Sequence, residues 1–401
     1  MKGKIIFLTT DLAYGGAETQ VVQLAIRLKE RGWKVLVVSL IPPQAYVEEL
    51  EKVGIPVFSL GIHQKMPDPR PVLRLFKLAR GWRPHIVHSH MVHANILARI
   101  VRPLVRVPLL VCTAHSIDER GRRGSGRLRV FLYRLTDPFC DLTTQVSQAG
   151  YERYVRIGAV PKHKIRYIPN GVDTRVFCPD PIARDRFRKE LGLTKDFVWL
   201  AVGRFEPPKD YPTLIKGFFE VAKINPGVKL LIVGDGPLRP FIEKLTQDMS
   251  LNEKIRFLGT RRDINQLMNA ADAYVMSSEW EGMPMVLLEA SACGLPIVAT
   301  NVGGNGEIVL DGQTGFLVPP KSPKALAQAM LRMMDIPEEV REKMGKQARE
   351  HIEKNFNLDH IVDYWEALYY ELLDRSRGVD QIQGVPKSLD ANSEDDFDQL
   401  L

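Results

Sequence analysis

Short apolar runs alternate with amphipathic helical patterns along most of the chain. In the first half, the runs expected to form strands cover residues 5–10, 35–40, 57–60, 86–90, 109–115 and 142–147. In the second half, they cover residues 197–203, 229–234, 255–259, 273–277, 296–300 and 315–319. Strands that are apolar throughout and separated by helices are typical of parallel sheets with helices on both faces. The pattern therefore predicts an α/β protein with two such sheets.

A turn-forming segment, Pro-Asn-Gly-Val-Asp at residues 169–173, lies between the two series of strands. The expected divisions are a first domain over residues 1–170, a second over 171–355, an aromatic-rich helix over 356–377 that packs back on the first domain, and an acidic disordered tail over 378–401. Open α/β sheets bind ligands beyond the carboxyl ends of their strands. Two sheets that face each other therefore predict an interdomain cleft.

Composition and charge narrow the class of protein further. The four cysteines have no metal-like spacing, and no apolar run reaches the roughly 20 residues of a membrane span, so we expect a reduced, cytoplasmic protein. The net charge is +7, but the last 24 residues hold six acids and one lysine, which leaves +12 on the rest. This excess favours anionic partners, and no nucleic-acid-binding motif accompanies it.

Two carboxylates, Glu281 and Glu289, flank the expected start of a helix. Pro284 suits the first helical position, which leaves the N–H groups of Met285, Val286 and Leu287 without intrahelical partners. Such a helix start attracts a phosphate, and the carboxylates accept hydrogen bonds from hydroxyls. A sugar joined to a phosphate supplies both groups. The alternative is a surface helix with an acidic first turn.

Two loops at strand ends have residues suited to phosphate. Gly15 and Gly16 follow the first strand and open a helix, where a ligand can approach the backbone closely, although a tight turn alone also explains them. Arg204 and Lys209 lie five residues apart after a buried strand, which suits two contacts to a diphosphate. A pair of solvated loop cations is the alternative.

Other strand ends hold turns and histidines. Gly234 ends one strand, and Phe257 and Gly259 end the next, where backbone can read the edge of a nucleobase or form plain turns. His115 ends an apolar strand where its side chain is expected to face the cleft, with a buried core histidine as the alternative. Four more histidines crowd one strand and its flanks, but no complete metal set accompanies them: His85, His88, His90 and His93.

A basic, apolar segment follows residue 119. It is expected to give the first domain a cationic face for lipid headgroups or an acceptor pyrophosphate, or to be only a basic solvated surface. Its arginines are Arg122, Arg123, Arg127 and Arg129, and Arg99, Arg102 and Arg106 lie nearby in sequence. An Asp396-Phe-Asp398 triplet matches a metal-holding motif, but it lies in the acidic tail, so no metal site is expected there.

Together these motifs resemble the retaining nucleotide-sugar glycosyltransferases of glycosyltransferase family 4, which have the GT-B arrangement of two facing Rossmann-like domains. The resemblance covers roughly residues 4–373, and its motifs occur in the family's order: Gly15-Gly16-Ala17-Glu18, Pro169 to Asp173, Val202-Gly203-Arg204 with Lys209, Val233 to Pro237, Glu281 to Glu289, and Thr314 to Pro319. One departure is Gly303-Gly304-Asn305-Gly306-Glu307, where the family often has Gly-Gly-x-Pro-Glu; the extra glycine is expected to loosen this turn and puts the donor sugar in doubt.

The resemblance implies roles for these residues. Glu281, Arg204, Lys209 and His115 would be catalytic, with the two cations on the diphosphate and Glu281 and His115 on the transferred sugar. The implied donor-binding residues are Gly15, Gly16, Gly234, Phe257, Gly259, Gly282, Met283, Pro284, Met285, Val286 and Glu289. Glu289 would hold the ribose, and neither a metal nor another cofactor is implied.

The expected activity is transfer of a sugar, with retention of configuration, from a UDP- or GDP-sugar to a lipid-linked or polysaccharide acceptor at the cytoplasmic face of the membrane. Contact with an anionic membrane is expected to be peripheral, and nucleic acid is not expected as a partner. Two alternatives stay open: a nucleotide-sugar epimerase on the same fold, and a silent sensor that kept the cleft.

Overall fold

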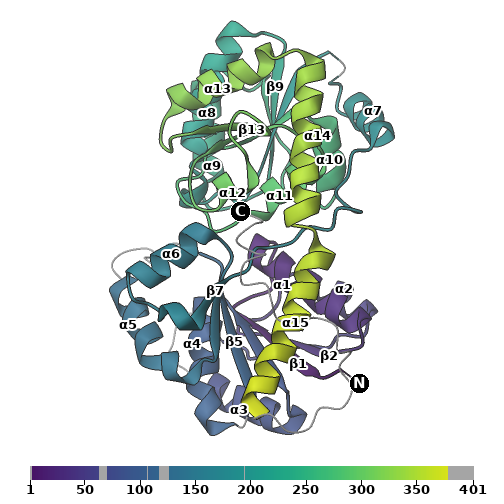
Figure 1. Cartoon of the computed structure of the whole chain (residues 1–401). Helices are drawn as coiled ribbons and strands as arrows, with labels where there is room; N and C mark the ends of the chain where they lie inside the picture. The colour runs from purple at the N-terminus through teal and green to yellow at the C-terminus, as the bar shows by residue number, and fades with distance from the viewer. Residues whose placement is uncertain (1, 63–69, 106, 117–125, 194, 378–401) are drawn as a thin grey trace.

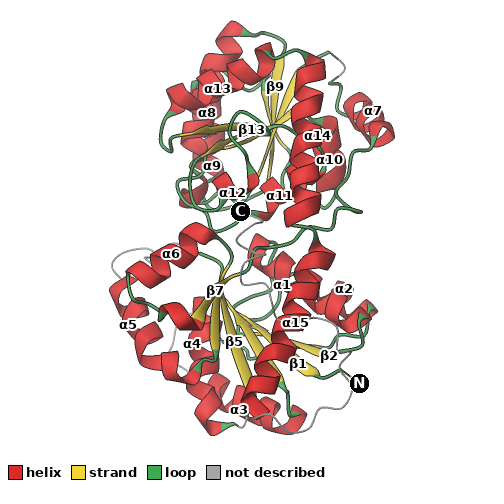
Figure 2. Ribbon diagram, viewed as in Figure 1, coloured by secondary structure: helices red, strands yellow, loops and turns green. Residues whose placement is uncertain are grey.

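The structure is a computed structural model that describes residues 2–62, 70–105, 107–116, 126–193 and 195–377. It consists of two α/β domains stacked end to end, each with a parallel sheet between layers of helices (Figures 1 and 2). The predicted fold class is therefore confirmed. Among the described residues, no helix combines the length and the apolar character needed to cross a membrane.

The N-terminal sheet has seven parallel strands in the order β3-β2-β1-β4-β5-β6-β7. The strands are β1 Lys4–Thr9, β2 Lys34–Ser39, β3 Val57–Ser59, β4 Ile86–His90, β5 Leu109–Ala114, β6 Leu142–Gln145 and β7 Ile165–Tyr167. Its helices are α1 Gly16–Glu30, α2 Val47–Lys52, α3 Arg70–Trp82, α4 Val92–Val101, α5 Gly126–Thr136 and α6 Gln148–Arg156, with single 3-10 turns η1 Arg102–Leu104, η2 Asp137–Phe139 and η3 Lys162–Lys164. The apolar pattern does not predict β7, because this three-residue edge strand contains Arg166 and follows Lys164.

The C-terminal sheet has six parallel strands in the order β10-β9-β8-β11-β12-β13. The strands are β8 Phe197–Val202, β9 Val228–Val233, β10 Ile255–Phe257, β11 Ala273–Met276, β12 Ile297–Thr300 and β13 Gly315–Val318. Its helices are α7 Pro181–Glu190, α8 Tyr211–Ile224, α9 Arg239–Asp248, α10 Ile264–Ala270, α11 Met285–Ala292, α12 Asn305–Ile308, α13 Pro323–Asp335 and α14 Glu338–Asn355, with the 3-10 turn η4 Pro207–Lys209. The central strands are almost fully buried, as apolar runs predict.

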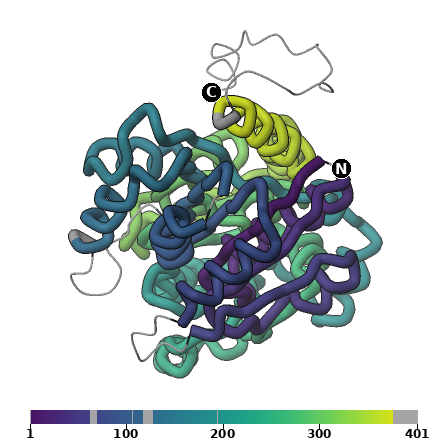
Figure 3. Tube along the Cα trace, turned by 90° about the horizontal axis from the view of Figure 1, so that it is seen from below, coloured from purple at the N-terminus to yellow at the C-terminus, as the bar shows by residue number. Residues whose placement is uncertain are grey.

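The last helix, α15 (Leu358–Arg377), returns to the N-terminal domain and lies against α1 and β5. Its Trp365 and Tyr369 are buried in the core with residues of β1 and β4. Its Glu366 forms an ion pair of 2.8 Å with Lys2, and Figure 3 shows the N-terminal end of the chain beside this helix. The residues expected to form a disordered acidic tail, 378–401, lie outside the described part of the chain.

The chain crosses between the domains twice, and the two crossings lie side by side. The Val172 N–H donates to the Phe356 carbonyl oxygen at 2.9 Å, and the Leu358 N–H donates to the Val172 carbonyl oxygen at 3.0 Å. At Gly171, a Cβ would lie 2.8 Å from the Leu358 Cα, so a larger residue would push the crossings apart. A two-stranded connection thus joins the domains at one edge.

Candidate active site in the interdomain cleft

The carboxyl ends of both sheets meet across the cleft, and two glycines allow the close approach. A Cβ at Gly282, in the loop before α11, would overlap the carbonyl oxygen of His115, just past the end of β5. A Cβ at Gly16, the first residue of α1, would lie 3.2 Å from the Met285 Cγ at the start of α11. The sequence-predicted residues from both domains are therefore brought together.

On the C-terminal side, Lys209 and Glu281 form the central charged pair. The Lys209 Nζ lies 2.6 Å from Glu281 Oε1, and the Ser278 hydroxyl donates to the same oxygen at 2.7 Å. Both side chains are largely buried, which strengthens the interaction relative to a surface pair. Arg204, by contrast, keeps an exposed guanidinium whose positive charge is felt by Glu18 in the opposite domain. Sequence reasoning did not single out Ser278.

The start of α11 differs from the expectation by one residue. Pro284 occupies the N-cap in an extended conformation, because α11 begins at Met285. The expectation of a free Leu287 N–H was wrong, because this group donates to the Pro284 carbonyl oxygen at 3.1 Å. The donors left free in the first turn are those of Met285 and Val286. The start of α1, capped by Gly15, faces this turn from the other domain. Two positive helix ends therefore converge on the cleft.

Glu289 lies one turn inside α11 and is almost fully buried. Burial raises the pKa of its carboxyl to about 7 because the charged form loses its hydration. The two carboxylates that look alike in sequence thus have different environments. Glu281 has a cationic partner, whereas Glu289 is buried near Tyr274 and Cys293.

The glycine turns of the C-terminal domain pack against one another. Gly234 has φ +134° and its N–H donates to the Gly259 carbonyl oxygen at 2.8 Å. A Cβ at Gly234 would overlap the carbonyl oxygen of Gly203, next to Arg204. Gly259 has φ +65°, and the ring of Phe257 lies edge-on to Phe205, with 6.1 Å between ring centres. These glycines are thus required for packing at the strand ends, whatever ligand the turns meet.

On the N-terminal side, His115 is held by another histidine. The His115 Nε2 lies 2.9 Å from the His90 Nδ1, and burial lowers the pKa of His115 to about 4 and that of His90 well below its usual range. Both rings are therefore neutral at pH 7, so the N–H of one ring donates a hydrogen bond to the bare nitrogen of the other. The spacing in sequence did not reveal this pair, because a gap of 25 residues separates two neighbouring strands.

A pair of acids lies at the start of α1. Glu18 is buried, its carboxylate lies against Gly15, and it interacts with Asp11 at the end of β1. Burial and the neighbouring Asp11 carboxylate raise the pKa of Glu18 to about 8, so Glu18 is mostly protonated at neutral pH. Asp11 and Glu18 belong to a recognised glycine turn, but only the folded chain shows that the two acids interact.

The histidine-rich strand β4 serves the core as well as the cleft. His88 is fully buried and contacts the Tyr369 hydroxyl at 2.6 Å and the Thr113 hydroxyl at 2.7 Å. Its ring packs 4.0 Å from that of His90. Within the described ranges, no group of three or more His, Cys, Asp or Glu side chains is arranged to hold a metal ion.

The expected basic face is only partly described. Arg122 and Arg123 lie outside the described residues, as does Arg106, and the side chain of Arg127 is not described. Arg129 lies in the first turn of α5. Arg99 does not belong to a surface: it is fully buried, with its guanidinium 4.5 Å from the ring centre of Tyr133 and 2.7 Å from the Thr143 hydroxyl. The expectation of an exposed Arg99 was wrong because α4 turns this residue toward the sheet.

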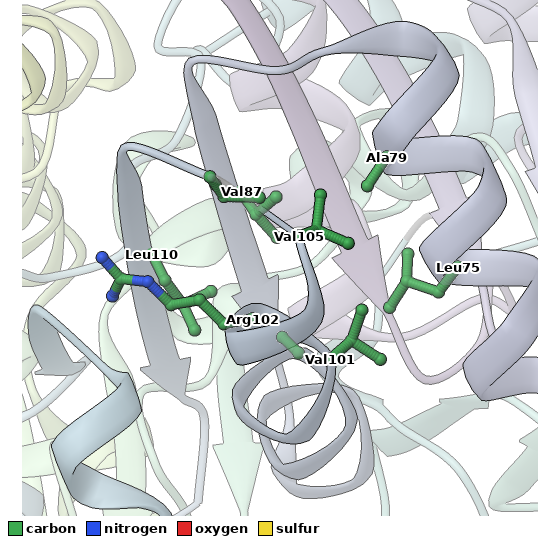
Figure 4. A pocket seen from close by; sticks show the side chains of 9 residues that line it. Leu75, Ala79, Val87, Val101, Arg102, Val105 and Leu110 are labelled. Atoms are coloured by element: carbon green, nitrogen blue, oxygen red, sulfur yellow. The ribbon is translucent and has the colours of Figure 1, made fainter.

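An apolar pocket lies away from the cleft, between α3, α4 and η1 of the N-terminal domain (Figure 4). Aliphatic side chains such as Leu75, Val87 and Leu110 line it, with Arg102 at its rim. Its cavity volume of about 20 Å³ has room for little more than one water molecule. It therefore does not compete with the cleft as a site for a sugar nucleotide.

Two facing Rossmann-like domains, with cations and helix starts at the carboxyl ends of their strands, define the GT-B class. Two family models match the chain, the "Glycosyltransferase Family 4" model over residues 14–195 and the "Glycosyl transferases group 1" model over residues 183–351. The crystal structure of Anabaena HepE in complex with UDP and glucose superposes with a TM-score of 0.83 at 25% identity, covering 92% of this chain and all of that one.

Characterised relatives agree with this class. An Escherichia coli UDP-Gal:alpha-D-GlcNAc-diphosphoundecaprenol alpha-1,3-galactosyltransferase is 33% identical over 76% of this chain and 80% of its own length. A Mycolicibacterium smegmatis GDP-mannose-dependent phosphatidylinositol monomannoside mannosyltransferase is 34% identical over 72% of this chain and 77% of its own length. The chain belongs to glycosyltransferase family 4, which does not favour the epimerase or sensor alternatives.

Proposed function

We propose that this enzyme transfers a sugar from a UDP- or GDP-sugar, bound in the cleft, to a lipid-linked or polysaccharide acceptor, without a metal ion and with retention of configuration. The observation that carries the proposal is the Lys209–Glu281 pair of 2.6 Å beside the start of α11 and opposite Gly16. A cation, two helix starts and a carboxylate that can accept from hydroxyls lie close together there, which supports recognition of a nucleotide sugar.

The proposed chemistry is stabilisation of the leaving nucleoside diphosphate. Negative charge develops on the diphosphate as the glycosidic bond breaks, and Lys209, Arg204 and the N–H groups at the start of α11 would stabilise it. In this role the cations do what a metal ion does in other transferases, which supports metal independence. Glu289 and the turns at Gly234 and Gly259 would hold the nucleoside.

Retention of configuration is proposed to occur by attack on the same face that the leaving group departs from. A covalent route would need a free carboxylate as nucleophile. Glu281 is a poor candidate because its Oε1 already accepts from Lys209 and Ser278, an arrangement that suits binding of sugar hydroxyls. A donor phosphate oxygen would then take the proton of the acceptor hydroxyl.

The names of the relatives and the charge of this chain support the proposed acceptor and location. The Escherichia coli and mycobacterial relatives are named for lipid-linked acceptors, and the basic N-terminal domain of this chain suits an anionic membrane. We therefore place the enzyme at the cytoplasmic face as a peripheral protein. The division into units 1–170, 171–355 and 356–377 is part of the same proposal, supported by the two separate sheets and the return of α15.

The test is a screen of the purified protein against UDP-, GDP- and ADP-sugars, read by thermal shift and by slow hydrolysis of the donor. We expect one UDP- or GDP-sugar to stabilise the protein and be hydrolysed, and Lys209→Ala and Glu281→Ala to lose both effects. The released sugar, trapped by methanol and analysed by NMR, should keep the anomeric configuration of the donor. Release of an isomerised sugar without any acceptor would instead identify an epimerase, and binding without turnover in the presence of candidate acceptors a sensor.

A further inference from the structure

Helix α5 presents apolar side chains on its outer face as well as on its inner one. Leu128, Phe131 and Leu135 are 60%, 57% and 60% exposed. With 100° per residue, these three positions lie within an arc of about 60° on the helix. The inner face is closed by Tyr133, which is buried. A helix that is apolar on both faces is expected to be covered on both.

Neighbouring elements extend this apolar surface. Leu104 of η1, Ile100 of α4 and Phe139 of η2 are also exposed. Arg102 of η1 donates to the Phe139 carbonyl oxygen at 2.9 Å, which holds η1 and η2 together, and α4 and α5 are in contact. We call these six residues the apolar face. Helices α4 and α5, which carry four of them, lie to the lower left in Figure 1.

Hydrogen bonds in the interior hold α5 in a fixed position beneath the apolar face. The Asn95 amide donates to the Tyr133 hydroxyl at 3.0 Å, and the buried Arg99 donates to the Tyr133 carbonyl oxygen at 3.2 Å. These contacts join α4 to α5 through the interior. The exposure of Phe131 and Leu135 therefore belongs to a fixed surface, not to a loosely packed helix.

The charge around the apolar face is strongly positive. Residues 92–105 and 126–167 hold ten Lys and Arg against three Asp and Glu. Arg99 is buried and Arg166 pairs with Glu371 of α15, so the excess that remains is +5. On α5, Arg129 and Arg134 lie on either side of the apolar stripe, about 100° or more from its centre. An apolar centre with basic flanks complements an anionic lipid surface, since the apolar side chains enter the acyl region while arginines remain at the headgroups.

We propose that the apolar face, Ile100, Leu104, Leu128, Phe131, Leu135 and Phe139, is the surface by which this enzyme inserts into an anionic phospholipid bilayer. It deepens the proposed function, on which it rests for its purpose, by naming the residues that bring the cleft to a lipid-linked acceptor. Isolated exposed apolar residues elsewhere, such as Ile182 of α7 at 81% exposure, carry no such meaning, because no apolar neighbours on α7 accompany it.

The test uses the full-length protein and sedimentation with vesicles of phosphatidylcholine with or without phosphatidylglycerol. We expect wild type to bind the anionic vesicles, and the double variant Phe131→Ser/Leu135→Ser to bind at least about tenfold more weakly, since each side chain loses its transfer to the acyl region. Ile182→Ser is the matched control and should bind like wild type. High salt should weaken binding of wild type because it screens the arginines.

Donor hydrolysis by the same variants separates this proposal from the proposed function. The double variant should hydrolyse donor at the wild-type rate because the apolar face lies outside the cleft, so loss of vesicle binding alone supports the apolar face. Vesicle binding without any donor turnover would leave the apolar face standing and reject the enzymatic proposal. Equal binding by wild type and double variant, or a concentration-dependent dimer that the double variant abolishes, would overturn the membrane assignment.

Discussion

The cleft has one side from each domain, called here the N-terminal wall and the C-terminal wall. The two walls differ in how the hydrogen-bonding and charged groups of their residues are paired. On the C-terminal wall, charges are matched within the protein, as in the Lys209–Glu281 pair with its hydrogen bond from Ser278. On the N-terminal wall, Thr10 Oγ1, Asp11 Oδ1 and His90 Nε2 are buried and find no hydrogen-bond partner among the described residues. Buried polar atoms without partners cost free energy. The C-terminal domain also has such atoms, Ser291 Oγ, Asn305 Oδ1 and Glu307 Oε2. What separates the two walls is therefore the ion pair, since the N-terminal wall offers neutral histidines and the largely protonated Glu18 in its place.

The largest effect is expected from a change at the contact between the two walls, where Gly282 meets His115. Gly282→Ala inserts a methyl group against the His115 carbonyl and should force the walls apart. We expect turnover to fall about 100-fold or more, because displacements near 1 Å have that effect, together with about 1–3 kcal/mol of stability. Turnover assays and thermal melts measure both.

Gly81→Ala, in α3, is the control, since nothing lies within 4 Å of the added methyl group. It should leave turnover unchanged. Full activity of Gly282→Ala would show that the walls do not need this contact.

The buried carboxyl of Glu289, on the C-terminal wall, predicts that the free energy of unfolding depends on pH. The pKa of Glu289 is raised from 4.5 to about 7 in the folded state, so its contribution favours folding most below pH 4.5 and is lost as pH rises through 7. The size is about 3 kcal/mol. Glu289→Gln should therefore flatten the fall in unfolding free energy between pH 5 and 8, measured by urea denaturation.

Some dependence on pH should remain in Glu289→Gln, because Glu18 also has a raised pKa, about 8. The exposed Glu253→Gln is the control and should follow the wild-type curve. An unchanged slope in Glu289→Gln would mean that this carboxyl is ionised at little cost in the folded protein.

The Lys209–Glu281 ion pair of the C-terminal wall is tested by the variant Lys209→Ala. Removal of the ammonium leaves Glu281 without its cation and the diphosphate without one of its contacts, so we expect donor hydrolysis to fall about 100-fold, or about 2.7 kcal/mol in transition-state stabilisation. Lys216→Ala, on the exposed side of α8, is the matched control. If Lys209→Ala kept both turnover and the donor-induced thermal shift, the proposed role of Lys209 would be wrong.

The smallest effect on turnover is expected from a substitution on the N-terminal wall. His90→Phe removes the partner of His115 Nε2 but keeps a ring of similar size, so His115 should lose its fixed orientation. We expect kcat to fall about tenfold, or about 1.4 kcal/mol, with little change in the donor KM. His163→Phe, on an exposed turn, controls for ring substitution. An equal loss in the control, or none in His90→Phe, would contradict the positioning role.

Apolar runs predicted the sheets well because the inner strands are buried on both faces, whereas the short edge strands β3, β7 and β10 are only partly buried. The short, charged edge strand β7 has too little of that signal. The cleft residues at strand ends were predictable because topology places the carboxyl ends of parallel strands together. The His90–His115 bond and the Asp11–Glu18 interaction were not, since they depend on side-chain directions across neighbouring elements. For α5, the sequence predicts an amphipathic pattern but not that an apolar side faces outward.

The paired crossing at Val172 and Phe356 has a mechanical consequence. Because the two connecting segments are hydrogen-bonded to each other, they must bend together when the domains move. We therefore expect the domains to rotate about this edge, like two leaves of a hinge. The edge itself then moves least, and the carboxyl ends of strands farthest from it move most. A nucleotide sugar would enter and leave by this one rotation, whose closed limit is set by Gly282 against His115.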